Sequence, residues 1–128
     1  MIHERVQLMT AALQSLLDAP SHRISNVLAQ KLAHAAVPGV YLISAPSQPE
    51  SIVYVGRTKT KTVLGRLNDH CCLSTPSDLS GMLLRYPDQA QDARSYDIRW
   101  VSVEDDISRA QLELFAIAVL KPPFNRYI

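Results

Sequence analysis

Basic and proton-carrying side chains are concentrated between residues 57 and 70. Four cationic side chains follow one another in this stretch: Arg57, Lys59, Lys61 and Arg66. No acidic residue interrupts them before Asp69, although the whole chain has a formal net charge of only +1. At about 100° per residue, Arg66 and His70 lie about 40° apart on a helix, so one helix face offers two cationic or proton-carrying groups. A role in nucleic-acid binding would have to rest on this local patch, because the global charge does not indicate one.

A single carboxylate stands out in the last third of the chain. Glu113 is the only polar side chain in the run from residue 113 to residue 120, so it is expected at the edge of a buried surface. The simplest interpretation is an exposed pairing with Arg109, one helical turn earlier, which would stabilise the helix by a few tenths of a kcal/mol.

Three further polar features also have purely structural interpretations. Arg66 and His70 can be solvated side chains on the outer face of a helix. Tyr54, alone in its predicted strand, can be a core tyrosine whose hydroxyl reaches water. Asn125 follows two prolines and can be a turn residue. Each of these signals is weak when it is taken alone.

The helices and strands that carry these residues can be predicted from the spacing of apolar residues and from prolines and glycines that end an element. Two amphipathic helices in residues 1–36 predict an N-terminal helical hairpin. Three strands are expected from β-branched and aromatic runs, at residues 40–43, 52–55 and 96–103. Further helices are expected at residues 64–73, 79–86 and 107–120. The order of elements is therefore two helices, two strands, one or two helices, a strand and a final helix.

Length and composition indicate one globular domain over residues 1–128. An apolar fraction of 47% is enough for a real core. The two cysteines, Cys71 and Cys72, are adjacent, which excludes a disulfide framework and a four-cysteine zinc site. The longest apolar run, residues 114–120, is too short to span a bilayer, so a soluble cytoplasmic protein is expected.

Two triplets resemble the paired motif of the GIY-YIG nuclease superfamily, each with valine in place of isoleucine. They are Gly39-Val40-Tyr41 and Tyr54-Val55-Gly56. The remaining polar positions of the family pattern follow in the same order: Arg57 after the second triplet, Arg66 with His70 one turn later, Glu113 on a helix, and Asn125. The resemblance covers residues 38–127 and leaves the first two helices outside.

The resemblance implies an α+β fold with a small three-stranded antiparallel sheet flanked by helices. It also implies an endonuclease that hydrolyses phosphodiester bonds in DNA with Mg²⁺ or Mn²⁺. A single carboxylate suits such a hard cation, which keeps much of its water shell, and Glu113 is the expected ligand. The metal would act as a Lewis acid, so a base that activates water is still required.

The resemblance also suggests a role for each remaining residue. Tyr54 would be the base, although a tyrosine ordinarily has a pKa of about 10, so positive charge from Arg57, or His70 as a proton acceptor, would have to help. His70 could itself be the base. Arg66 would donate a forked pair of hydrogen bonds to the phosphate. Tyr41 and Asn125 would position the other groups of the site. Lys59 and Lys61 would hold the phosphates that flank the scissile one.

Several functions remain open at this level. The leading hypothesis is a compact restriction or defence endonuclease. The alternatives are a DNA-repair or structure-specific nuclease, a non-catalytic nucleic-acid-binding module on the same fold, and an interaction domain that uses the first two helices. Whether the DNA is duplex or single-stranded is not resolved. Because so small a chain has little surface with which to read a long site, sequence-specific cleavage would require a homodimer or a partner protein, with the N-terminal helices as the expected interface.

Overall fold

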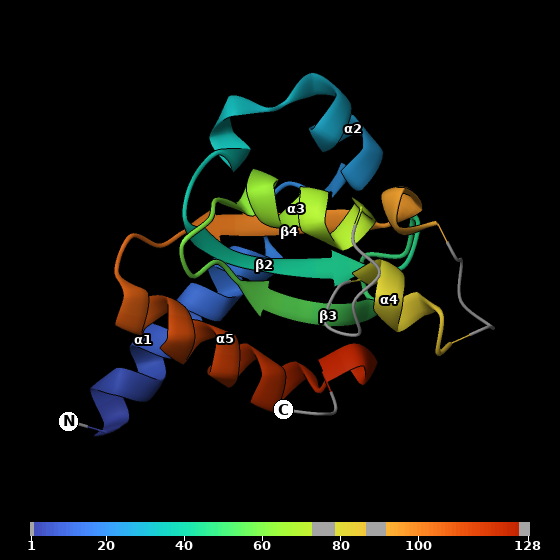
Figure 1. The fold of residues 1–128 in the computed structure, drawn as a ribbon. Helices are drawn as coiled ribbons and strands as arrows, with labels where there is room; N and C mark the ends of the chain where they lie inside the picture. The colour runs from blue at the N-terminus through green and yellow to red at the C-terminus, as the bar shows by residue number, and fades with distance from the viewer. Residues whose placement is uncertain (1, 73–78, 87–91, 126–128) are drawn as a thin grey trace.

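One antiparallel sheet separates two layers of helices in the computed structural model, as Figure 1 shows. The structure describes residues 2–72, 79–86 and 92–125. The helices and strands in chain order are α1 (Ile2–Leu17), β1 (His22–Arg23), α2 (Ile24–Gln30), η1 (Ala33–Ala35), β2 (Gly39–Ser44), β3 (Ile52–Arg57), α3 (Val63–Cys72), α4 (Leu79–Leu83), η2 (Ala93–Ser95), β4 (Asp97–Ser102), α5 (Asp106–Leu120) and η3 (Pro123–Asn125). The five α-helices and the three longer strands of the described residues lie where the sequence predicts them, with ends that differ by a few residues, whereas the short helices η1, η2 and η3 were not predicted.

Strand β2 lies inside the sheet, whose strand order is β1-β4-β2-β3 with every pairing antiparallel. All six residues of β2 are buried because helices cover both faces of the sheet. The register places Tyr41 of β2 opposite Gly56 of β3 and opposite Trp100 of β4. Strand β3 forms one edge of the sheet, so its outer side is open to groups from both helix layers.

Each face of the sheet carries its own apolar core. Helices α2, α3 and α4 cover the face that contains Tyr41 and Ile98. Helices α1 and α5 cover the opposite face, where Leu16 packs against Val40 and Leu42. Complete burial of a leucine such as Leu16 stabilises the fold by roughly 1.5–3 kcal/mol, so these contacts fix the position of each helix on the sheet.

The predicted N-terminal helical hairpin is wrong, although both of its helices are present. Helix α1 packs beside α5 on one face of the sheet, and α2 packs beside α3 on the other (Figure 1). The apolar stripes that suggested mutual packing, represented by Leu13 on α1 and Val27 on α2, are each buried in a different core. The first two helices are therefore part of the same packed unit as the sheet.

The α+β fold class is confirmed, but the sheet has four strands and not three. The additional strand β1 consists of His22 and Arg23, which pair with Ile98 and Asp97 of β4. Two residues are too few to produce an alternating pattern, so the sequence carried no signal for this strand. Leu73, at the end of the predicted third helix, and residues 126–128, at the end of the predicted core, lie outside the described residues. Within the described part, no helix combines the length and apolar character needed to cross a membrane.

Candidate active site

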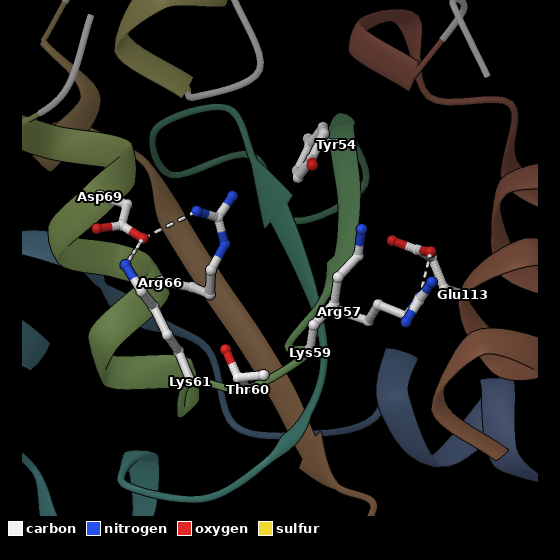
Figure 2. A pocket seen from close by; sticks show the side chains of 8 residues that line it. All are labelled: Tyr54, Arg57, Lys59, Thr60, Lys61, Arg66, Asp69 and Glu113. Atoms are coloured by element: carbon white, nitrogen blue, oxygen red, sulfur yellow. Dashed lines mark hydrogen bonds and ion pairs between the residues drawn. The ribbon is translucent and has the colours of Figure 1, made fainter. Parts of the chain in front are cut away.

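A pocket of about 490 Å³ opens beside strand β3. Eight side chains line it: Tyr54, Arg57, Lys59, Thr60, Lys61, Arg66, Asp69 and Glu113. Figure 2 shows that Arg66 and Asp69 come from α3, Glu113 from α5, and Tyr54 and Arg57 from β3 between the two helices. Six of the predicted site residues therefore meet in one place, although up to 59 residues of sequence separate them: Tyr54, Arg57, Lys59, Lys61, Arg66 and Glu113.

The edge position of β3 explains how residues from both faces of the sheet reach one pocket. Tyr54 and Arg57 are three residues apart, so their side chains leave the strand on opposite faces. Tyr54 packs against the core beneath α3, and Arg57 reaches toward α5. In an interior strand the two groups would be separated by the sheet itself. At the edge, both can line the same opening.

Glu113 pairs with Arg57 and not with Arg109. Arg57 donates from Nε to Glu113 Oε1 over 3.0 Å, and both side chains are partly buried. The expected pairing with Arg109 is wrong because the Arg109 guanidinium is buried and fully occupied elsewhere. It donates to the backbone carbonyls of Thr58, Lys59, Val103 and Glu104, and also to the carboxylate of Asp106. Arg109 thus fixes the backbone that presents Lys59 at the pocket.

Asp69 is a member of the site that the sequence analysis missed. Its carboxylate accepts hydrogen bonds from Lys61 Nζ at 2.5 Å and from Arg66 NH1 at 3.0 Å. The bond from Lys61, together with that from Arg66, lowers the pKa of the Asp69 carboxyl. Asp69 therefore stays ionised and orients two cationic groups at the pocket wall. The three-residue spacing between Arg66 and Asp69 on a helix was the available signal.

His70 is fully buried, which corrects the expectation that it lies on a solvated helix face. Its Nδ1 accepts the backbone N–H of Leu79 at 2.8 Å, and its Nε2 lies 2.8 Å from the hydroxyl oxygen of Tyr41. Burial lowers the pKa of His70 to about 3, so the ring is neutral at pH 7. Because Nδ1 is an acceptor, the single ring proton lies on Nε2 and is donated to Tyr41.

Tyr41 is held as a neutral phenol behind the pocket. Its side chain is buried, and burial together with the nearby Tyr54 raises its pKa above the ordinary value. The hydroxyl oxygen accepts the proton of His70, which leaves the phenolic hydrogen as a donor. The rings of Tyr41, Tyr54 and His70 form one cluster, with centroids 5.4–6.3 Å apart. Tyr41 and His70 therefore lie directly behind Tyr54, and neither of them lines the pocket.

We expect His70 to make folding stability depend on pH. The unfolded chain binds a proton on this histidine below pH 6.5, whereas the folded chain binds it only near pH 3. Stability from this residue is therefore complete above pH 6.5 and is lost as the pH falls, by up to about 1.4 kcal/mol per pH unit. Urea unfolding between pH 7 and pH 4 should show a steeper loss for the parent than for His70→Gln. Parallel pH dependence in the two proteins would contradict the neutral, buried state of His70.

Gly56 permits the close packing of the two tyrosines. A Cβ atom at this position would lie 2.5 Å from Tyr41 Oη and 2.8 Å from Tyr54 Cε2, which is closer than atoms can pack. We expect Gly56→Ala to lower the free energy of unfolding by roughly 1–3 kcal/mol, because a ring must move. Gly65→Ala on α3 is the matched control, since its Cβ would meet only ordinary contacts at 3.5 Å, and it should stabilise by up to about 1 kcal/mol. Equal thermal unfolding temperatures for the two variants would contradict this.

Asn125 lies outside the pocket and holds strand β3 from its open side. Its side-chain Oδ1 accepts the N–H of Val55 at 2.8 Å, and its Nδ2 donates to the carbonyl of Val55 at 2.9 Å. Both backbone groups of Val55 point away from β2, so the buried amide of Asn125 replaces a neighbouring strand at this residue. Asn125 thereby fixes the backbone next to Tyr54. It is therefore more than the turn residue that the simplest interpretation of the sequence suggested.

The lining residues fit a hydrated divalent cation. Mg²⁺ is commonly bound through one or two carboxylates and keeps several water molecules. The carboxylate of Glu113 faces the pocket, and six waters at about 30 Å³ each occupy roughly 180 Å³, well within the volume available. Among the described residues, no group of three or more His, Cys, Asp or Glu side chains is arranged as a metal site. A cation here would therefore rely on Glu113, water and a ligand.

The sheet, its two helix layers and the basic pocket at the edge strand define an α+β protein with an open polar site. The chain is similar to two solved structures of the GIY-YIG N-terminal endonuclease domain of UvrC from Thermotoga maritima, both tyrosine-to-phenylalanine point mutants bound to the catalytic divalent cation. Each comparison covers 78% of this chain and 94% of the other, with a TM-score of 0.52 and sequence identities of 19% and 18%. No protein-family model and no curated protein matches the chain. The chain has the GIY-YIG nuclease fold, as the paired motif predicted.

Proposed function

We propose that this protein is a metal-dependent endonuclease that hydrolyses phosphodiester bonds in DNA. The observation that carries the proposal is the pocket beside β3, where a tyrosine, two arginines and a carboxylate from three separate elements converge. The two UvrC domains with the same fold are endonuclease domains that bind a catalytic divalent cation. A fold alone does not define a function, so the argument depends on the residues of the pocket.

The pocket suits an anionic, oxygen-rich substrate. Four cationic side chains and two carboxylates line it, which gives a formal charge of +2. Arg66 can present a planar fork to a phosphate, and Asp69 fixes its orientation through NH1. Lys59 and Lys61 lie on the segment after β3 and are suited to hold flanking phosphates. Base-specific contacts would have to come from other surfaces.

Glu113 is the proposed ligand of the divalent cation, which would act as a Lewis acid on the scissile phosphate and stabilise the leaving oxygen. Tyr54 is the proposed base, because its ring lines the pocket while Tyr41 and His70 are buried behind it. His70 is a poor candidate for the base, since its two ring nitrogens are occupied by Leu79 and Tyr41. It is better assigned as a positioning residue that keeps Tyr41 as a hydrogen-bond donor. Arg66 would stabilise the negative charge that develops on the phosphate.

A homodimer is proposed as the form that cuts a defined duplex sequence. Large apolar side chains are exposed on two neighbouring helices: Ile2, Val6 and Leu8 on α1, and Ile107, Leu114 and Val119 on α5. Exposed apolar groups on adjacent helices favour association. Light scattering at the concentration used for cleavage measures the state, and a monomer that cuts one defined duplex site would contradict the dimer. The sequence-based preference for a restriction or defence enzyme over a repair nuclease stays a prediction.

The experiment that tests the proposed activity is cleavage of labelled duplex and single-stranded DNA with Mg²⁺, with Mn²⁺, and with chelator. We expect cleavage with either metal and none with chelator, because the lining residues offer no substitute Lewis acid. DNA binding without cleavage under all conditions would favour the non-catalytic binding module. Undiminished cleavage in chelator would remove Glu113 from its proposed role.

A further inference from the structure

Arg57 forms an ion pair with Glu113, the proposed ligand of the cation. Its Nε–H donates to Glu113 Oε1 at 3.0 Å, and the two side chains are only 27% and 17% exposed. A charged hydrogen bond in a partly buried position is stronger and less screened than a surface pair. A divalent cation that approaches Glu113 therefore meets a carboxylate with one oxygen, Oε1, already held by the guanidinium, and it is repelled by the positive charge of that guanidinium.

The charge of the pocket also opposes a cation when no substrate is present. With four cationic side chains and two carboxylates, the lining repels a divalent ion and attracts a phosphate. Arg57 carries five N–H donors, so it can exchange a carboxylate for a phosphate without loss of hydrogen bonding. A phosphate that draws Arg57 away would free Glu113 and add negative charge at the same time.

We propose that Arg57 couples the two ligands of this site, by holding Glu113 in the empty protein and releasing it when a DNA phosphate binds. Duplex DNA and the divalent cation then bind cooperatively, and the cation binds weakly to the protein alone. This inference rests on the proposed function. By linkage, the factor by which DNA raises cation affinity equals the factor by which the cation raises DNA affinity.

The first measurement is the affinity of the protein for Mn²⁺ without DNA. The electron paramagnetic resonance signal of the free ion reports how much Mn²⁺ is unbound at each step of the titration. Arg57→Gln should bind Mn²⁺ about tenfold more tightly than the parent, because the competing group is gone. Lys59→Gln is the matched control: it removes one positive charge from the same pocket, but its exposed side chain lies in the segment after β3. Its effect should be about twofold or less, as expected for screened, longer-range charge. Arg57→Lys, which keeps the charge, should restore much of the weak binding of the parent.

The second measurement repeats the titration with a short DNA duplex, with every protein also carrying Tyr54→Phe to slow turnover. DNA should raise Mn²⁺ affinity in the Arg57-containing protein, and the gain should be about tenfold smaller with Arg57→Gln. Equal gains with and without Arg57 would overturn the coupling, as would equal Mn²⁺ affinities of Arg57→Gln and Lys59→Gln.

A third variant separates failure of the coupling from failure of the proposed function. If Glu113→Gln abolishes Mn²⁺ binding while Arg57→Gln behaves like its control, the cation site stands and the coupling is wrong. If Glu113→Gln leaves Mn²⁺ binding unchanged, Glu113 is not the ligand and the proposed metal role falls, together with the coupling that depends on it. Circular dichroism of each variant establishes that the fold is intact.

Discussion

Replacement of Glu113 by glutamine should reduce the rate of DNA cleavage by roughly 10³-fold or more while DNA binding is kept. Glutamine preserves the size of the side chain and much of its hydrogen bonding, but removes the charge that a hard cation requires. DNA affinity should stay similar or rise, because a negative charge leaves a pocket whose cationic groups are proposed to contact the phosphates. Single-turnover cleavage and a filter-binding assay, both on the same duplex, measure the two quantities.

Two variants serve as controls for Glu113→Gln. Glu104→Gln makes the same chemical change at an exposed position just before α5, outside the residues that line the pocket, and should leave cleavage unchanged. Arg66→Ala should weaken both DNA binding and cleavage, because it removes a proposed phosphate contact. A Glu113→Gln protein that cleaves at the parent rate would refute the assignment and return the chain to the binding-module hypothesis.

Tyr54→Phe should lower the cleavage rate by roughly 10²- to 10⁴-fold, as expected for loss of a general base. The fold should persist, because the phenyl ring keeps its contacts with Tyr41 and His70. Tyr86→Phe is the matched control: its hydroxyl donates to the carbonyl of Pro123, and its side chain is not among those that line the pocket. Single-turnover rates at saturating Mg²⁺ measure the chemical step.

His70 provides the decisive comparison for the base. If Tyr54→Phe cleaves near the parent rate while a folded His70→Ala protein is inactive, the base would belong to His70. The buried position of His70 and its two occupied nitrogens lead us to expect the reverse order of effects. His70→Ala should act through the loss of Tyr41 positioning and through the cavity it leaves, which thermal unfolding would detect.

Local sequence predicted most of the elements and six of the eight residues that line the pocket. The spacing of apolar residues, and the prolines and glycines that end an element, located the longer strands and helices to within a few residues. These patterns are effective because each depends only on residues that are close together in the sequence. Tyr96, Ile98 and Trp100 alternate along the predicted strand at residues 96–103, and in the structure all three side chains belong to the same core. The two triplets containing Tyr41 and Tyr54, together with the polar positions that follow them in order, predicted the fold.

Only the tertiary structure decided how these residues act together. Arg57 pairs with Glu113 across 56 residues of sequence, a contact that helical spacing cannot reveal and that displaced the expected Arg109 pairing. The solvated or buried state of His70 depended on whether α4 covers it, which its own helix does not specify. Tyr54 and Arg57 leave β3 on opposite faces, yet share a pocket because β3 is an edge strand. Strand order is set by the packing of distant apolar surfaces, so no local pattern could have determined it.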